Sequence, residues 1–253
     1  MKKRRPRSKT TRADGARRSS VIEIPKDVAT AIKRCWPDGM VEEFPTEESY
    51  FHEIRHELVR DLSGISGASL VWQSEEARGP RWDDDDELPF DSEWQSYRVF
   101  FVSPNGKEFR FEDETTGDNP EGGTETTYPG EGRFGLAVAI SLAAPVAVIN
   151  RSHYSQFEDG TTACPDLTSS LFWDEETGEE ISAEVYQRDL LEREMVKKLE
   201  DLRQEIVSII ASHRISVLDE SVLDLPVKGL RADPDVFLQK PLRVRDAFFF
   251  RGV

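Results

Sequence analysis

The chain has 253 residues, of which 37% are hydrophobic, and this is enough to bury a core in one large domain. Its two cysteines, Cys35 and Cys164, are far apart and outside any CxxC spacing, which excludes a disulfide framework and a cysteine zinc knuckle and indicates a reducing compartment. The formal net charge of −16 is unevenly distributed, because residues 1–20 carry nine basic residues and one acid, which leaves −24 on residues 21–253. The body therefore favours basic partners and repels nucleic acid, whereas the N-terminal segment does the opposite.

Residues 1–20 are predicted to form a disordered basic arm, because they contain almost no large apolar side chain that could offset the entropy of ordering. Two interpretations fit this arm. In the first it is a nuclear-type address or a nucleic-acid-binding segment, and in the second it is a solubilising tail that lies on the acidic body. No aromatic residue is interleaved among the basic ones, so nucleic-acid binding would be independent of sequence. The residues concerned are Lys2, Lys3, Arg4, Arg5 and Arg7.

No membrane association is expected. The arm has no apolar segment behind it and does not read as a secretory signal. The longest apolar run, 134–149, is interrupted by Gly135, Ser141 and Pro145, which excludes a transmembrane helix. We expect a cytoplasmic protein, or a nuclear one if the source is eukaryotic.

Two helices are predicted in the N-terminal part of the body. Val28, Ile32 and Trp36 recur at helical spacing from about Pro25, and turn residues end this segment at Gly39. A second helix is expected from about Thr46, where acidic residues favour the first turn, to the Ser63-Gly64 stop. Its buried stripe is expected to be Phe51, Ile54, Leu58 and Leu62.

Acidic loops and strands follow. Segment 82–93 reads as a solvated acidic loop, since the adjacent carboxylates of Asp83, Asp84, Asp85 and Asp86 repel one another. Segments 97–102 and 108–111 flank the turn residues 103–106 and predict a β-hairpin. A second loop, rich in Gly, Thr and Glu, is predicted at 113–133.

Segment 134–144 allows two interpretations. Large side chains alternate with alanines from Leu136 to Leu142, which favours a buried strand, and an Ala-rich helix is the alternative. Pro145 then forces a break before a strand at 146–150.

The C-terminal half is predicted to hold one long helix, from an N-cap at Ser182 to about His213. Its apolar residues follow a heptad over about two repeats, too few for a free coiled coil, so we expect it to pack on its own sheet. The apolar residues of segment 242–250 predict a closing strand. These elements together predict one α+β domain at 21–253, with a mostly antiparallel sheet, N-terminal helices and one long helix in the C-terminal half.

His52-Glu53-Ile54-Arg55-His56 matches H-E-x-x-H on a segment predicted to be helical. These five residues resemble the motif of zincin metalloproteases. The resemblance implies that His52 and His56 bind zinc and that Glu53 is the catalytic general base. The histidines, however, flank the buried stripe, Arg55 places a positive charge between them, and no third ligand follows at the spacing of the family. Two surface histidines on an ordinary amphipathic helix are the alternative.

Segment 130–135, Gly-Glu-Gly-Arg-Phe-Gly, has the glycine spacing of dinucleotide-binding folds. That motif needs a strand before it and a helix N-terminus after it. Here the preceding residues are polar and end in Pro129, and Glu131 places a carboxylate where phosphate would lie. The pattern therefore does not predict a nucleotide site.

The leading functional hypothesis is a non-enzymatic interaction protein of the inhibitor, immunity or accessory-subunit type, without a cofactor. Its acidic body would bind a basic protein partner through Trp82 and the four aspartates 83–86, because acidic patches steer association and an aromatic side chain anchors it. One alternative is a zinc-dependent metallohydrolase that uses His52, Glu53 and His56. Another is a nucleic-acid-associated accessory factor that acts through the basic arm.

Overall fold

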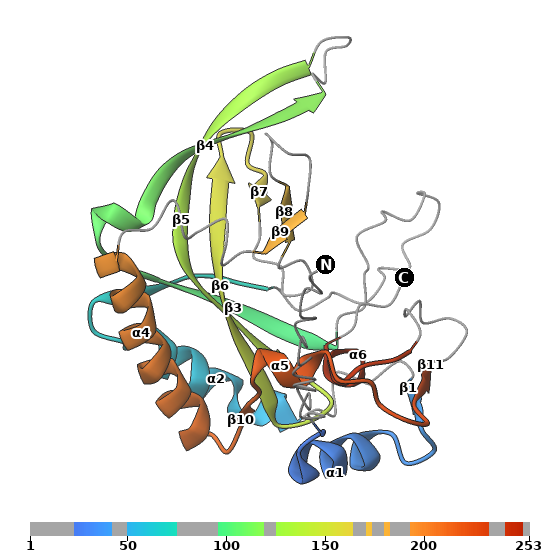
Figure 1. The fold of residues 1–253 in the computed structure, drawn as a ribbon. Coiled ribbons are helices and arrows are strands. Elements are labelled where there is room, and N and C mark those ends of the chain that lie inside the picture. The colour runs from blue at the N-terminus through green and yellow to red at the C-terminus, as the bar shows by residue number, and fades with distance from the viewer. Residues whose placement is uncertain are drawn as a thin grey trace, which may run out of the picture.

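The computed structural model describes residues 23–41, 50–74, 96–118, 125–163, 171–173, 180–182, 193–232 and 241–249. A mostly antiparallel sheet dominates this part of the chain and helices cover it, so the predicted α+β class is confirmed (Figure 1). None of the described helices is both long and apolar enough to cross a membrane. The predicted arm at 1–20 and the acidic loop at 82–93 lie outside the described residues.

A long central strand, β5 (Glu125–Ser141), organises the sheet. One edge of β5 pairs with β6 (Val146–Phe157), and its other edge pairs first with β4 (Arg110–Asp118) and then with β3 (Tyr97–Pro104). β2 (Ala68–Gln73) extends the sheet beyond β3, while β7 (Thr162–Ala163) and, in parallel, β10 (Ser216–Val217) pair with β6. β8 (Leu171–Trp173) and β9 (Glu180–Ser182) form a separate antiparallel pair.

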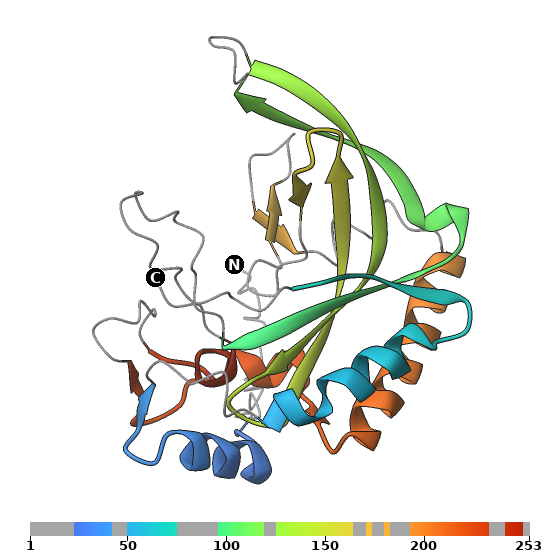
Figure 2. The same cartoon turned by 180° about the vertical axis from the view of Figure 1, so that it is seen from behind.

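The alternation of side chains along β5 separates two cores. Leu136, Val138 and Ile140 pack in the core that contains α2 (Tyr50–Ser63) and α4 (Arg193–Ser212). Ala137 and Ala139 point to the other face, where the core contains residues of α1 (Lys26–Cys35), α5 (Glu220–Leu223) and α6 (Val244–Phe248) (Figure 2). The strand prediction for this segment, with one large and one small face, is confirmed, and the helix alternative is wrong.

The long helix packs on its own sheet, as predicted. Its buried residues are Met195, Leu199, Leu202, Ile206 and Ile210. A strict heptad would have ended this stripe on Ile209, which is only half-buried. The stripe shifts by one position because a helix on a sheet keeps about 3.6 residues per turn and does not supercoil. Ser182 does not begin this helix, because it lies in β9 opposite Leu171, and α4 begins at Arg193.

Both N-terminal helices are anchored at the turn between β5 and β6. The hydroxyl of Tyr50 in α2 lies 2.8 Å from the carbonyl oxygen of Ser141 and 2.9 Å from that of Ala144. The thiol of Cys35 in α1 donates to the carbonyl oxygen of Ala143 at 3.0 Å. Burial raises the pKa of this thiol to about 11, so it stays protonated and unreactive at neutral pH.

The predicted hairpin at 97–111 is wrong. β3 and β4 do not pair with each other but follow one another along the same edge of β5, with the short 3₁₀ helix η2 (Lys107–Phe109) between them. Turn residues do interrupt the strand, and Asn105 donates its backbone N–H to the Gly67 carbonyl at 3.0 Å. A turn signal marks such a break, but the choice of pairing partner depends on a strand more distant in the sequence.

The predicted loop at 113–133 is also wrong, because most of it forms the pair β4 and β5. Its strands carry threonine, which favours β-structure, and Gly130 and Gly132 lie opposite Phe157 and Phe111. Polar composition therefore reflects solvent exposure in this segment and not the absence of a strand.

The predicted closing strand is wrong as well. Residues 244–248 form α6, whose Val244, Ala247 and Phe248 are buried at helical spacing. The carboxylate of Asp246 accepts the backbone N–H of Arg243 at 2.6 Å, which caps this helix. Next to it, β1 (Met40–Val41) and β11 (Arg231–Ala232) form a short parallel pair.

Candidate functional site

The H-E-x-x-H segment lies on the exposed face of α2. His52, Glu53 and His56 are all exposed, because the stripe beside them is buried in the core under the sheet. Of the other histidines, His153 lies on β6 and His213 follows α4. Within the part of the chain that the structure describes, no three His, Cys, Asp or Glu side chains gather to hold a metal ion. The zincin-like interpretation gains no support from this geometry.

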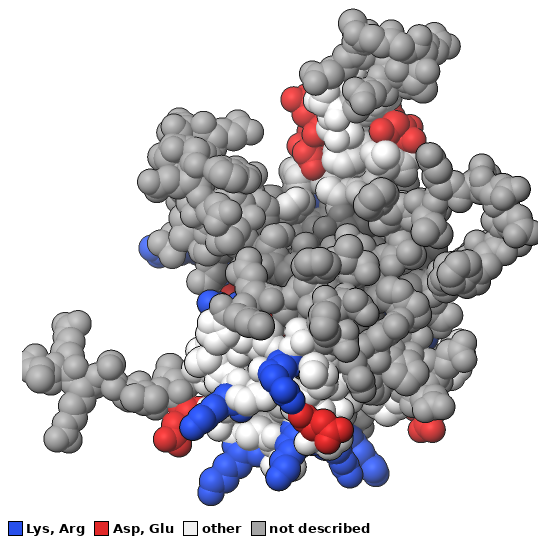
Figure 3. Space-filling model, turned by 90° about the vertical axis from the view of Figure 1, so that its right-hand side faces the viewer, with Lys and Arg blue, Asp and Glu red and all other residues white. Residues whose placement is uncertain are grey.

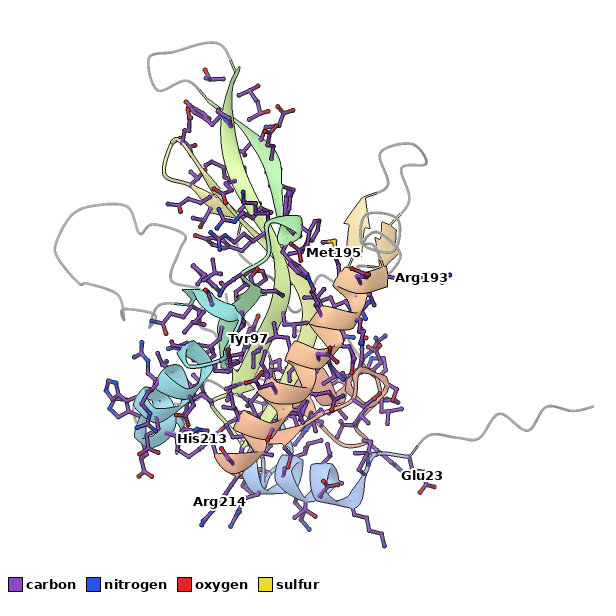
Figure 4. The ribbon with its side chains drawn as sticks, turned by 90° about the vertical axis from the view of Figure 1, so that its left-hand side faces the viewer. Glu23, Tyr97, Arg193, Met195, His213 and Arg214 are labelled. Carbon is purple, nitrogen blue, oxygen red and sulfur yellow. The ribbon has the colours of Figure 1, made fainter. Side chains whose placement is uncertain are left out.

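His213 instead joins the two helices under the sheet. Its Nε2 lies 3.0 Å from the Asp61 carboxylate of α2, and its side chain is 8% exposed (Figure 4). Hydrogen bonds from Arg60 and His213 lower the pKa of Asp61 below 3.8. This contact ties the C-terminal end of α4 to α2 and has a structural role.

The glycines of segment 130–135 also have a structural role, because they lie inside β5 and each faces an aromatic ring. A Cβ at Gly130 would come within 2.5 Å of the Phe157 ring, and a Cβ at Gly132 would overlap the Phe111 ring. At Gly135 it would come within 2.7 Å of the Phe101 ring. Glycine is needed there because the rings of neighbouring strands lie across the backbone. The nucleotide-binding pattern is therefore coincidental.

An acidic arm is the most distinctive charged region of the described sheet. We use this name for residues 110–116 of β4, 126–133 of β5 and 156–159 at the end of β6. Six carboxylates and two arginines give it a formal net charge of −4. Figure 3 shows acidic side chains gathered at this end of the molecule. The carboxylates belong to Glu112, Asp113, Glu114, Glu131, Glu158 and Asp159.

A cleft of about 470 Å³ opens at the base of the acidic arm. Its polar lining includes Glu131, Arg133 and Glu158, and its apolar lining includes Val71 and Phe157. Glu131 and Arg133 share the face of β5 with Ala137 and Ala139, so the cleft opens on the side of the sheet opposite α2 and α4.

Tyr154, which lines this cleft, packs against two other aromatic rings. Tyr154 of β6 stacks on Trp72 of β2 with ring centroids 6.3 Å apart and lies 6.0 Å from the Phe101 ring. Glu131 accepts from Arg110 at 3.1 Å and lies 3.8 Å from the Arg133 guanidinium. The lining of the cleft thus combines aromatic side chains with charged groups, as that of binding sites commonly does.

The residues predicted to bind a partner or nucleic acid, Trp82 with the aspartates 83–86 and the basic residues 2–7, lie outside the described residues. The cleft is not predicted from the sequence, because the composition of segment 113–133 predicts a loop. The alternation of Glu131, Arg133 and Gly135 on one face would have been the usable signal.

Comparison of the chain with known protein families, with curated proteins and with solved structures finds no match. Function must therefore be inferred from the geometry and charge of the molecule.

Proposed function

We propose that the chain is a non-enzymatic interaction protein of the inhibitor, immunity or accessory-subunit type, whose acidic arm binds a basic surface of a protein partner. The observation that carries this proposal is the coincidence of the acidic arm with the cleft at its base. Concentrated negative charge attracts a basic partner over about a Debye length, and a cleft provides the short-range contact that charge alone lacks.

The residues of the cleft suit the side chain of a lysine or arginine. The cleft is lined by two carboxylates, those of Glu131 and Glu158, and by one guanidinium, that of Arg133, so negative charge prevails. The side chain of Glu131 is 58% exposed although Arg110 and Arg133 lie beside it. The aliphatic part of a long basic side chain can contact Val71 and Phe157 while its charged end reaches the carboxylates. Trp82 and the aspartates 83–86 lie outside the described residues, and their contribution to partner binding stays a prediction.

The test measures association rates with a partner that co-purifies with the chain and is then isolated. One variant combines Glu112→Gln, Asp113→Asn and Glu114→Gln on the acidic arm. Its control combines Glu200→Gln, Asp201→Asn and Glu205→Gln, which removes three exposed carboxylates from α4. At low salt we expect the arm variant to associate about tenfold more slowly and with a flatter salt dependence, and the control to match the wild type.

An equal loss of association rate in both variants would show that only the overall charge matters and would contradict the proposal. Gln156→Trp probes the cleft separately, because Gln156 is exposed and lines it. A bulky ring there is expected to raise the dissociation rate and to leave the association rate nearly unchanged. Replacement of Asp83 to Asp86 by asparagine tests whether that run contributes to steering.

A further inference from the structure

A basic face lies at the end of the molecule opposite the acidic arm. We use this name for the Lys and Arg side chains of α1, of the segment around β11 and of the start of α6. Figure 3 shows several of these basic side chains together at the lower end of the view. The residues are Lys26, Lys33, Arg34, Lys228, Arg231, Arg243 and Arg245.

Tertiary contacts bring these three segments together from distant parts of the sequence. The indole N–H of Trp36, at the end of α1, donates to the Ala247 carbonyl of α6 at 2.9 Å. The backbone N–H of Arg231 donates to the Gly39 carbonyl at 2.8 Å, and Arg231 pairs with Met40. The basic face is therefore assembled by contacts between segments that are distant in the sequence.

The basic face carries more positive than negative charge. Five carboxylates, those of Glu23, Asp27, Asp38, Asp224 and Asp246, lie in or beside the same segments and leave a net formal charge of +2. Asp224 accepts hydrogen bonds from both Arg243 and Arg245. By contrast, the remaining five cations form no salt bridge within the described residues. These five are exposed and available to an anionic ligand.

The basic arm joins the molecule at this face. Residues 1–20, with nine basic side chains, lead into Glu23, directly before α1 (Figure 4). Two positively charged parts of the chain are thus connected at one end of a protein whose total charge is −16.

We propose that the basic face binds the phosphate backbone of double-stranded nucleic acid. Lysine and arginine gain affinity for phosphates by releasing condensed counterions, and this gain does not depend on sequence. Among the described residues of this region, the aromatic side chains of Trp36, Phe248 and Phe249 are buried. Base stacking on these rings is therefore unavailable, which favours a duplex over a single strand.

The experiment measures binding of the full chain to a labelled 20-base-pair DNA duplex of arbitrary sequence by fluorescence anisotropy, between 50 and 200 mM salt. The face variant combines Lys33→Gln, Arg34→Gln and Arg231→Gln. The control combines Lys107→Gln, Arg193→Gln and Lys197→Gln, which removes three exposed cations near the other end of α4. Since each phosphate contact adds about 0.9 to the salt slope, the slope should fall by about three in the face variant and stay unchanged in the control.

A further full-chain variant replaces Lys2, Lys3, Arg4, Arg5 and Arg7 by glutamine and is expected to weaken binding as well. The proposal is overturned if the face variant binds like the wild type, if the control loses as much as the face variant, or if the chain binds phosphatidylserine vesicles but not DNA. Neutralising Glu112, Asp113 and Glu114 should not weaken DNA binding. Failure of this proposal is therefore distinct from failure of the proposed partner binding at the acidic arm.

Discussion

The two halves of β5 differ in composition because they differ in what covers them. Between Phe134 and Ser141 the strand lies between two helical layers, and its residues are Leu, Val, Ile, Ala, Phe and Gly with one buried serine. Between Thr126 and Arg133 the same strand belongs to the acidic arm, and its residues are Thr, Tyr, Pro, Gly, Glu and Arg. One strand therefore serves two purposes: the covered half contributes to stability, and the open half presents charge and a cleft.

The largest difference between the halves should appear in stability. Leu136→Ala removes a side chain that is 1% exposed in the core under α2 and α4, and we expect a loss of about 2–5 kcal/mol in the free energy of unfolding. Thr127→Ala, on the exposed part of the same strand, should change it by less than about 0.5 kcal/mol. Urea unfolding of both variants measures the contrast, and equal effects would contradict the division of β5.

A smaller loss is expected where an aromatic ring covers the backbone of the acidic arm. Gly132→Ala would place a methyl group in the space of the Phe111 ring, and overpacking of this kind costs about 1–3 kcal/mol. The effect should shrink in a Phe111→Ala background, because the ring that clashes is then absent. A double-mutant cycle measured by thermal unfolding gives this coupling, and additive effects would show that Gly132 is needed for another reason.

The pH dependence of stability sharpens the comparison at the boundary between the halves. Burial lowers the pKa of His153 below its ordinary 6.5, and the charge of Asp113 partly offsets this. A histidine with a lowered pKa favours its neutral form in the folded state, so its contribution is present above about pH 6.5 and is lost as the pH falls below that value. Urea unfolding measured from pH 7.5 to 5 should show that the free energy of unfolding decreases, and this decrease should be smaller in His153→Gln. An unchanged decline would assign it to other groups.

The smallest effect on stability is expected from residues 1–20. Deleting them should leave the thermal midpoint unchanged, because they contain almost no apolar side chains that could pack on the body. A large drop would show that the basic arm docks on the acidic body. The measurement thus separates a free arm from one that neutralises the acidic arm within the same chain.

The sequence by itself was sufficient for the elements whose signals are local. Periodic apolar residues located α1, α2 and most of α4, and alternation from Leu136 to Leu142 located the covered half of β5. The same argument does not predict the polar half of β5, because one face of 126–132 is exposed and the covered face carries glycines in place of large apolar side chains. The strand predicted at 242–250 is wrong for a similar reason, because the spacing of four residues between Val244 and Phe248 also fits a helix, α6.

Only the tertiary structure decided which segments lie together. The sequence showed an acidic body and a basic arm, but not that the carboxylates of β4, β5 and β6 share one end of the sheet with a cleft. Likewise, Arg34 and Arg231 are almost two hundred positions apart in the sequence and meet on one face through the contacts of Trp36 and Gly39. Local patterns report the burial of each residue, whereas strand pairing and helix docking depend on long-range contacts, which a single sequence does not reveal.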